Sequence, residues 1–163
     1  MLLISFSKTA RPILRQTKVH SKSLSSFSDS QKKPTQRPKR IILIRHGESI
    51  GNVDDCSYVT TPDWRVPLTE RGIEQSFEAG KKLRDIIGED GKVFFYYSPY
   101  MRTRQTLKEL QHHIKDDQII SVREEPRISE QQFGNFQNVE DVWEFKKERH
   151  EFGRFYYRFQ SGE

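Results

Sequence analysis

The chain has one cysteine, Cys56, in 163 residues, so it forms no intrachain disulfide and suits a reducing compartment. It also lacks the spacings typical of zinc sites, the glycine-rich loops that bind nucleotides, and internal repeats. The apolar opening, residues 1–6, is too short for a signal-peptide core or a membrane span. We therefore expect no metal, no cofactor and no membrane partner.

Acidic residues are scarce at the N-terminus. Residues 1–40 contain ten lysines or arginines, eight serines and a single acid, Asp29, which gives a net charge of +9, whereas residues 41–163 carry −4. The basic pI therefore comes from the leader and does not indicate a nucleic-acid partner. This composition predicts a disordered mitochondrial or plastid transit peptide over 1–40, cleaved between Phe27 and Lys39. The alternatives are a plain basic tail on a cytoplasmic protein, or a basic arm that binds nucleic acid or membrane.

The segment IILIRHGESIGN, residues 41–52, carries the main chemical signal. Its apolar start has no polar alternation, which predicts a strand of a parallel sheet buried on both faces. Arg45 and His46 then lie at the carboxyl end of this strand, the edge where open α/β sheets bind ligands. A guanidinium can donate hydrogen bonds to two oxygens of one phosphate, and a neutral imidazole is a competent nucleophile toward phosphorus. The segment thus predicts phosphoryl chemistry on His46.

Two further strands and three helices are expected after a loop over 53–67. A helix follows with Thr69 as its N-cap and Gly88 past its end. Strands are expected over 92–98 and 119–122, and a helix from 99 to about 114. Ser98 is expected to cap that second helix, whose start would bind an anion, with Arg102 and Thr106 on one face. Residues 139–157 begin as a helix and then become aromatic, which favours core or pocket lining over an RNA-stacking platform.

Three segments in this order, RHGES followed by Asn52, SPYMRTRQT and SEQQFG, resemble the histidine phosphatase superfamily of phosphoglycerate-mutase-like proteins. The resemblance implies an α/β fold, a three-layer sandwich with a mostly parallel sheet. It also implies that His46 accepts a phosphoryl group, that Glu130 protonates the leaving oxygen, and that Arg45, Asn52 and Arg102 hold the phosphate of a small phosphorylated substrate. No metal is required.

The chain departs from the family pattern at two places. Gln131 and Phe133 replace the arginine and tyrosine of mutases, which favours a phosphatase over a phosphoglycerate mutase. The family's second histidine, in a histidine-glycine pair, has no counterpart, so we expect 41–163 to be a domain incomplete at its C-terminus, with weak or no turnover. A non-catalytic protein that binds phosphorylated ligands is the alternative. The substrate and the oligomeric state stay open.

Overall fold

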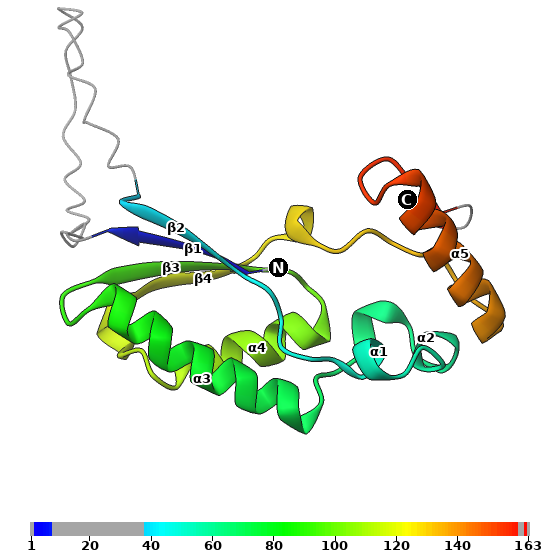
Figure 1. Cartoon of the computed structure of the whole chain (residues 1–163). Helices are drawn as coiled ribbons and strands as arrows, with labels where there is room; N and C mark the ends of the chain where they lie inside the picture. Colours follow the sequence, from blue (N-terminus) through cyan, green and yellow to red (C-terminus); the bar gives the residue numbers. More distant parts are fainter. Residues whose placement is uncertain (1, 8–37, 160–161, 163) are drawn as a thin grey trace, which may run out of the picture.

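The chain forms an α/β fold around one small sheet (Figure 1). The structure is a computed structural model that describes residues 2–7, 38–159 and 162. Its sheet has four strands in the order β2-β1-β3-β4, with the bounds β1 Leu2–Ser7, β2 Arg40–Ile44, β3 Lys92–Tyr97 and β4 Ile119–Glu124. β1 is antiparallel to both of its neighbours, and β3 and β4 are parallel. The carboxyl ends of β2, β3 and β4 therefore meet at one edge of the sheet.

β1 corrects one expectation from the sequence. Residues 1–40 were expected to be a disordered leader, yet Leu2–Ser7 pairs along its length with both β2 and β3. The physical reason is that a short apolar run, insufficient for a membrane span, is long enough for a strand. Ile4 is fully buried at this position. The rest of the expected leader, 8–37, lies outside the described residues.

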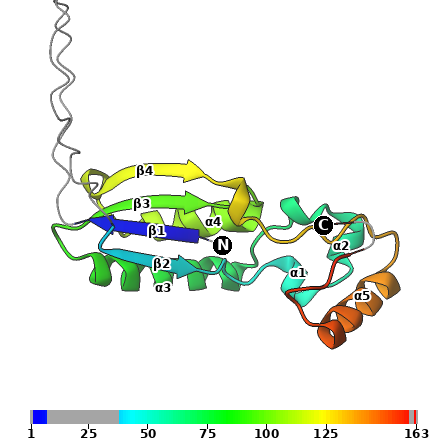
Figure 2. The ribbon, with the colours of Figure 1, turned by 90° about the horizontal axis from the view of Figure 1, so that it is seen from above.

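Two helices, α3 Glu70–Ile87 and α4 Met101–Gln111, pack side by side on one face of the sheet (Figures 1 and 2). The buried core lies between them and the strands and contains Ile4, Leu83, Ile87, Val93, Phe95, Leu107, Leu110 and Ile114. The predicted α/β class is confirmed. Within the described ranges the helices supply one layer on this sheet, so two of the three expected layers are present.

The opposite face of the sheet is open among the described residues. Ile41, Leu43 and Ile120 are 63%, 60% and 48% exposed. Burial therefore alternates along β2 and β3, although their sequences predicted strands buried on both faces. The reason is that an apolar residue on the second face stays exposed when no described helix covers it.

The bounds of α3 agree with the sequence, whereas those of α4 do not. The Thr69 hydroxyl accepts a hydrogen bond from the Gly72 N–H and caps α3. α4 begins at Met101 with Tyr100 as its N-cap, because residues 98–100 form a turn in which the Tyr100 N–H contacts Ser98 Oγ at 3.4 Å. The expected cap at Ser98 is thus wrong, and the first turn of the helix starts closer to Arg102.

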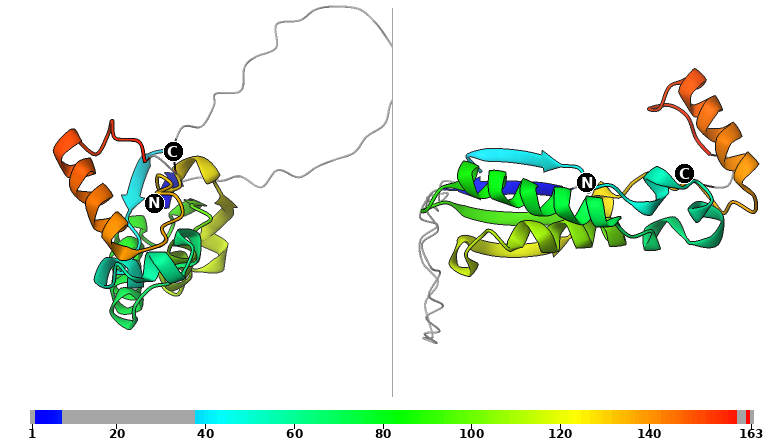
Figure 3. Two further views of the ribbon diagram at one scale, coloured as in Figure 1. Left: turned by 90° about the vertical axis from the view of Figure 1, so that its right-hand side faces the viewer. Right: turned by 60° about the horizontal axis from the view of Figure 1, so that its bottom comes forward.

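The segments past the sheet edge form a second, smaller cluster (Figure 3). They comprise α1 Ile50–Val53, α2 Ser57–Thr60, the 3₁₀ turn η1 Asp63–Arg65 and α5 Val139–Phe152, while the turns η2 Asp116–Gln118 and η3 Pro126–Ile128 flank β4. Phe136, Val142, Tyr157 and Phe159 form the buried part of this cluster. Core packing is confirmed for Tyr157 and Phe159. It is wrong for Phe152, Phe155 and Tyr156, which are 68%, 86% and 77% exposed.

Candidate active site

His46 lies two residues beyond the end of β2, and its ring orientation is fixed by its own neighbour. Its Nδ1–H donates a hydrogen bond of 2.6 Å to the Gly47 carbonyl. This bond leaves the Nε2 lone pair directed away from the backbone and available as a nucleophile. The pKa of His46 is lowered to about 4, mainly by burial; the charges of Arg102 and Arg45 also lower it, and the hydrogen bond to Gly47 acts in the opposite direction. The imidazole is therefore neutral at physiological pH.

Gly47 is held between α3 and α4. Its N–H donates to Thr106 Oγ1 at 3.1 Å, and Thr106 Oγ1 donates to the Arg102 carbonyl at 2.9 Å. A Cβ at Gly47 would lie 2.2 Å from the Gly72 carbonyl oxygen, so only glycine permits this approach. The position of His46 is thus fixed by contacts to both helices.

Of the two arginines whose charges act on His46, Arg102 lowers the pKa of the imidazole more than Arg45 does. The sequence predicted that Arg102 and His46 belong to one site, and the fold brings them together. Arg102 is 4% exposed and stands over the Tyr100 ring at 4.7 Å. By contrast, Arg104 pairs with Glu124 at 2.6 Å on the surface, as expected for a surface charge.

Asp63 is a site residue that the sequence did not reveal. Arg102 Nη1 donates to both the carbonyl and Oδ1 of Asp63, at 2.8 and 2.7 Å. Its other oxygen, Oδ2, is buried without a hydrogen-bond partner. Burial raises the pKa of the Asp63 carboxyl, and Arg102 offsets part of this rise. Residues 53–67 had no periodicity, so only the fold shows that this aspartate meets Arg102.

Arg45 and Asn52 differ in the ion pairs and hydrogen bonds that they make with other described residues. Arg45 is exposed, and none of the ion pairs within the described ranges includes it. Asn52 Oδ1 accepts hydrogen bonds from the N–H and hydroxyl of Ser49, at 3.0 and 3.1 Å, which caps α1. The amide oxygen of Asn52 is therefore used structurally, and its amide N–H groups are the part that an anion could engage.

Glu130 lies on the segment that follows η3, across from α2 and η1. Its carboxylate is 3.8 Å from Arg149 Nη2, and its backbone carbonyl accepts a hydrogen bond of 3.4 Å from the Tyr100 hydroxyl. The charge of Glu130 also raises the pKa values of Asp63 and Tyr58. It thus stands on the same side of the molecule as the pair of Asp63 and Arg102.

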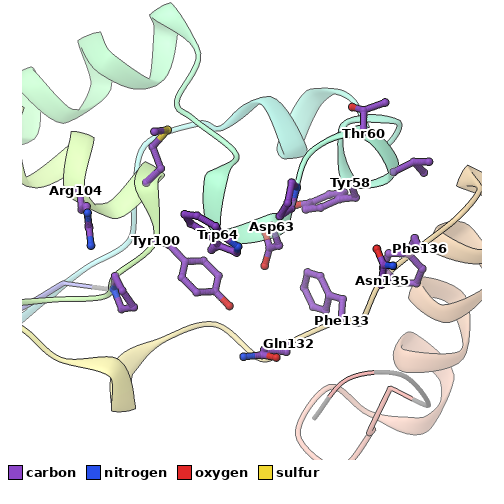
Figure 4. Close-up of a pocket in the computed structure, with 15 residues that line it drawn as sticks. Tyr58, Thr60, Asp63, Trp64, Tyr100, Arg104, Gln132, Phe133, Asn135 and Phe136 are labelled. Atoms are coloured by element: carbon purple, nitrogen blue, oxygen red, sulfur yellow. The ribbon is translucent and has the colours of Figure 1, made fainter.

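A cavity of about 930 Å³ opens beside this cluster, between η1, the start of α4 and residues 132–136 (Figure 4). Asp63 and Tyr100, which both contact Arg102, form part of its wall. Neither His46 nor Arg102 lines the cavity, but Arg102 contacts two residues of its wall and its charge acts on the His46 imidazole. The part of the chain that the structure describes contains no cluster of three or more metal-ligating side chains, and no described helix is long and apolar enough to cross a membrane.

Comparisons with known proteins show the family to which the chain is related. The family model described as histidine phosphatase superfamily (branch 1) matches residues 41–163. The phosphoglycerate mutase-like protein AT74H of Arabidopsis thaliana is 54% identical over 134 residues, which cover 77% of this chain and 48% of that protein. The broad-range acid phosphatase DET1 of Saccharomyces cerevisiae is 25% identical over 215 residues, covering 78% and 64%.

One solved structure, the protein histidine phosphatase SixA complexed with tungstate, matches with a TM-score of 0.36 and 25% identity over 49% of this chain and 46% of that chain. The chain spans about half the length of the Arabidopsis relatives that it matches.

Proposed function

Since the chain belongs to the histidine phosphatase superfamily, we propose that it hydrolyses phosphate monoesters through a phosphohistidine at His46. The observation that carries this proposal is the state of the imidazole. Its Nδ1–H is bonded to the Gly47 carbonyl, and its pKa of about 4 keeps Nε2 unprotonated at neutral pH. A nucleophile toward phosphorus needs this free lone pair.

The reaction would proceed in two steps. Nε2 of His46 attacks phosphorus, the bond to the ester oxygen breaks, and Glu130 gives that oxygen a proton. Water then gives a proton to the Glu130 carboxylate and attacks the phosphohistidine, the N–P bond breaks, and His46 and Glu130 are both restored as phosphate leaves. Arg45, Arg102 and the amide of Asn52 would hold the phosphate oxygens, since phosphoryl transfer depends mainly on positioning and electrostatic stabilisation.

Hydrolysis is favoured over a phosphoglycerate mutase reaction by two residues after Glu130. Gln131 donates a hydrogen bond to the Tyr157 carbonyl at 2.8 Å, and Phe133 packs against Tyr58 and Phe159. Neither side chain offers a cation to a substrate carboxylate. The similarity to an acid phosphatase supports the same choice.

We expect slow turnover of the 163-residue chain, because the resemblance implies a second histidine at the phosphate. Among the other described histidines, His112 pairs with Glu109 on the surface, His113 packs on Phe77, and His150 is exposed on α5. None of the three is in the contacts of His46 given above, and His20 lies outside the described residues.

Phosphoramidate, a small phosphoryl donor, tests the proposal. We expect it to place one acid-labile, alkali-stable phosphate on the chain, detected by intact mass and ³¹P NMR. The variant His46→Asn should lose the label, and the control His150→Asn, altered at an exposed histidine, should keep it. Absence of label on the unaltered chain, or label that persists in His46→Asn, would refute the proposal.

Binding of phosphorylated ligands without turnover is the second candidate function. It is favoured by the ion pair of Glu130 with Arg149, which engages the expected proton donor. Phosphate esters would then bind equally well to the unaltered chain and to His46→Ala, with no turnover in either. A large loss of binding in His46→Ala would argue against this candidate.

A further inference from the structure

The cavity beside Arg102 has a composition unlike that of the phosphate site. Its wall carries five aromatic side chains, Tyr58, Trp64, Tyr100, Phe133 and Phe136. Figure 4 shows that these rings come from α2, η1, the start of α4 and residues 132–136, which face one another across the hollow. Segments far apart in sequence thus contribute flat apolar surfaces to one space.

The cavity contains little charge. Asp63 and Arg104 are the ionisable groups of its wall other than the tyrosines, and Gln132, Asn135 and Thr60 add uncharged polar groups. Burial, together with the nearby charge of Asp63, raises the pKa of Tyr58 to about 12, so its hydroxyl stays neutral. Several ring faces with a few polar groups suit a planar, largely apolar ligand rather than a polyanion or a sugar.

The size of the cavity points the same way. Sites for small organic ligands measure roughly 300–1,000 Å³, and this cavity of about 930 Å³ lies near the upper limit. A three-carbon phosphate ester would leave most of the ring surfaces without a contact. A ligand with one or two fused rings would cover them.

Arg102 connects this cavity to His46. The guanidinium is paired with Asp63 and stacked on Tyr100, two residues of the cavity wall, and its charge acts on the His46 imidazole. A phosphate held between Arg102 and His46 would therefore direct its ester substituent toward the rings.

We propose that the cavity binds the leaving group of the substrate and that this group contains a planar aromatic ring. The proposal rests on the proposed function, because it names the substrate class of the same site. The chain would thus act on aromatic phosphate monoesters in preference to aliphatic ones of similar charge.

The two tryptophans provide a matched pair of variants. Trp64 lines the cavity and is 52% exposed, whereas Trp143 lies on α5 outside the cavity wall and is 55% exposed. Replacing either one removes a half-exposed ring without opening the core. Stacking on one ring is worth enough to change affinity by about 5- to 100-fold. Trp64→Ala should therefore weaken binding of 1-naphthyl phosphate at least about fivefold, and Trp143→Ala should leave it unchanged.

Binding is measured by calorimetry on the full chain, with 1-naphthyl phosphate and glycerol 2-phosphate as probes. We expect the unaltered chain to prefer the naphthyl ester, and Trp64→Ala to lose that preference while it binds glycerol 2-phosphate as before. Equal affinity for the two probes, or equal effects of Trp64→Ala and Trp143→Ala, would overturn the aromatic-substrate proposal.

The labelling and binding experiments together separate this proposal from the phosphatase mechanism. If phosphoramidate fails to label His46 but naphthyl phosphate binding still depends on Trp64, the mechanism fails and the aromatic site stands. If His46 is labelled and Trp64→Ala has no effect on naphthyl phosphate, the mechanism stands and the aromatic site fails.

Discussion

Thr106 links both helices to the segment that follows β2, and replacing it tests how His46 is positioned. The Thr106 hydroxyl accepts hydrogen bonds from the Gly47 N–H at 3.1 Å and the Ser76 hydroxyl at 3.4 Å and donates to the Arg102 carbonyl at 2.9 Å, with 1% of the residue exposed. Thr106→Val keeps the shape of the side chain and removes all three hydrogen bonds. The change therefore acts on polar contacts and leaves the packing volume almost unaltered.

The cost of this change follows from burial. The Gly47 N–H would lose its acceptor in a partly buried site, which costs roughly 1–3 kcal/mol. For a domain of this size that loss lowers Tm by roughly 4–12 °C. Because the Gly47 carbonyl orients the His46 ring, a displaced Gly47 should also slow phosphorylation of His46, by roughly 10- to 100-fold for a shift approaching 1 Å.

The assay pairs thermal unfolding with the rate of labelling by phosphoramidate. Thr106→Ser retains the hydroxyl and should keep the labelling rate close to that of the unaltered chain. Thr61→Val, the same replacement at the residue after α2 and outside the cavity wall, should change neither quantity. If Thr106→Val and Thr106→Ser label His46 at the same rate, the hydroxyl does not position the site and the reasoning is wrong.

Three further outcomes are expected. Because the pKa of His46 is lowered to about 4, the rate of labelling should not depend on its ionisation above about pH 5. The stability of the fold should decrease as the pH drops from 6.5 through 4, since the unfolded chain binds the proton more readily than the folded chain. Thermal unfolding of His46→Asn should lack this pH dependence. Ile4→Ala should lower the free energy of unfolding, measured in urea, by about 2–5 kcal/mol, because Ile4 is fully buried in β1. An unchanged free energy of unfolding would contradict the place of β1 in the sheet. Asp63→Ala leaves Arg102 buried and unpaired and should cost about 3–5 kcal/mol, against less than about 1 kcal/mol for Glu124→Ala at an exposed pair, both from thermal unfolding.

The features that the sequence predicted well are those set by local signals. The bounds of α3 follow from the Thr69 cap and from Gly88, whose φ of 71° ends the helix. β3 and β4 also lie where β-forming residues cluster, and the family follows from the ordered motifs. The roles assigned to the five site residues, His46, Glu130, Arg45, Asn52 and Arg102, stay predictions.

Features that depend on packing between distant segments were missed. The helical spacing of apolar residues over 70–87 predicts that Ile73 and Phe77 face inward, yet they are 39% and 37% exposed, and Gly72 and Ser76 are buried. The reason is the close approach of the segment that follows β2, since a Cβ at Gly72 would lie 2.0 Å from the Glu48 carbonyl oxygen. Periodicity records which residues are apolar and carries no information about which face a backbone approaches.

The N-terminal segment has the composition of a transit peptide and also contains a strand of the sheet. Composition indicates an organellar address over 1–40, and the fold uses Leu2–Ser7 as the strand between β2 and β3. Cleavage between Phe27 and Lys39 would remove that strand and leave β2 without a partner in the described sheet. Exposed edges of this kind pair with other strands, so a cleaved chain would need another segment in this place. We therefore expect chains that retain Leu2–Ser7 to stay monomeric and cleaved chains to associate or unfold. Mass spectrometry of the mature N-terminus, with light scattering of each form, checks this; a cleaved form that is monomeric and equally stable would show that β1 contributes nothing to the fold.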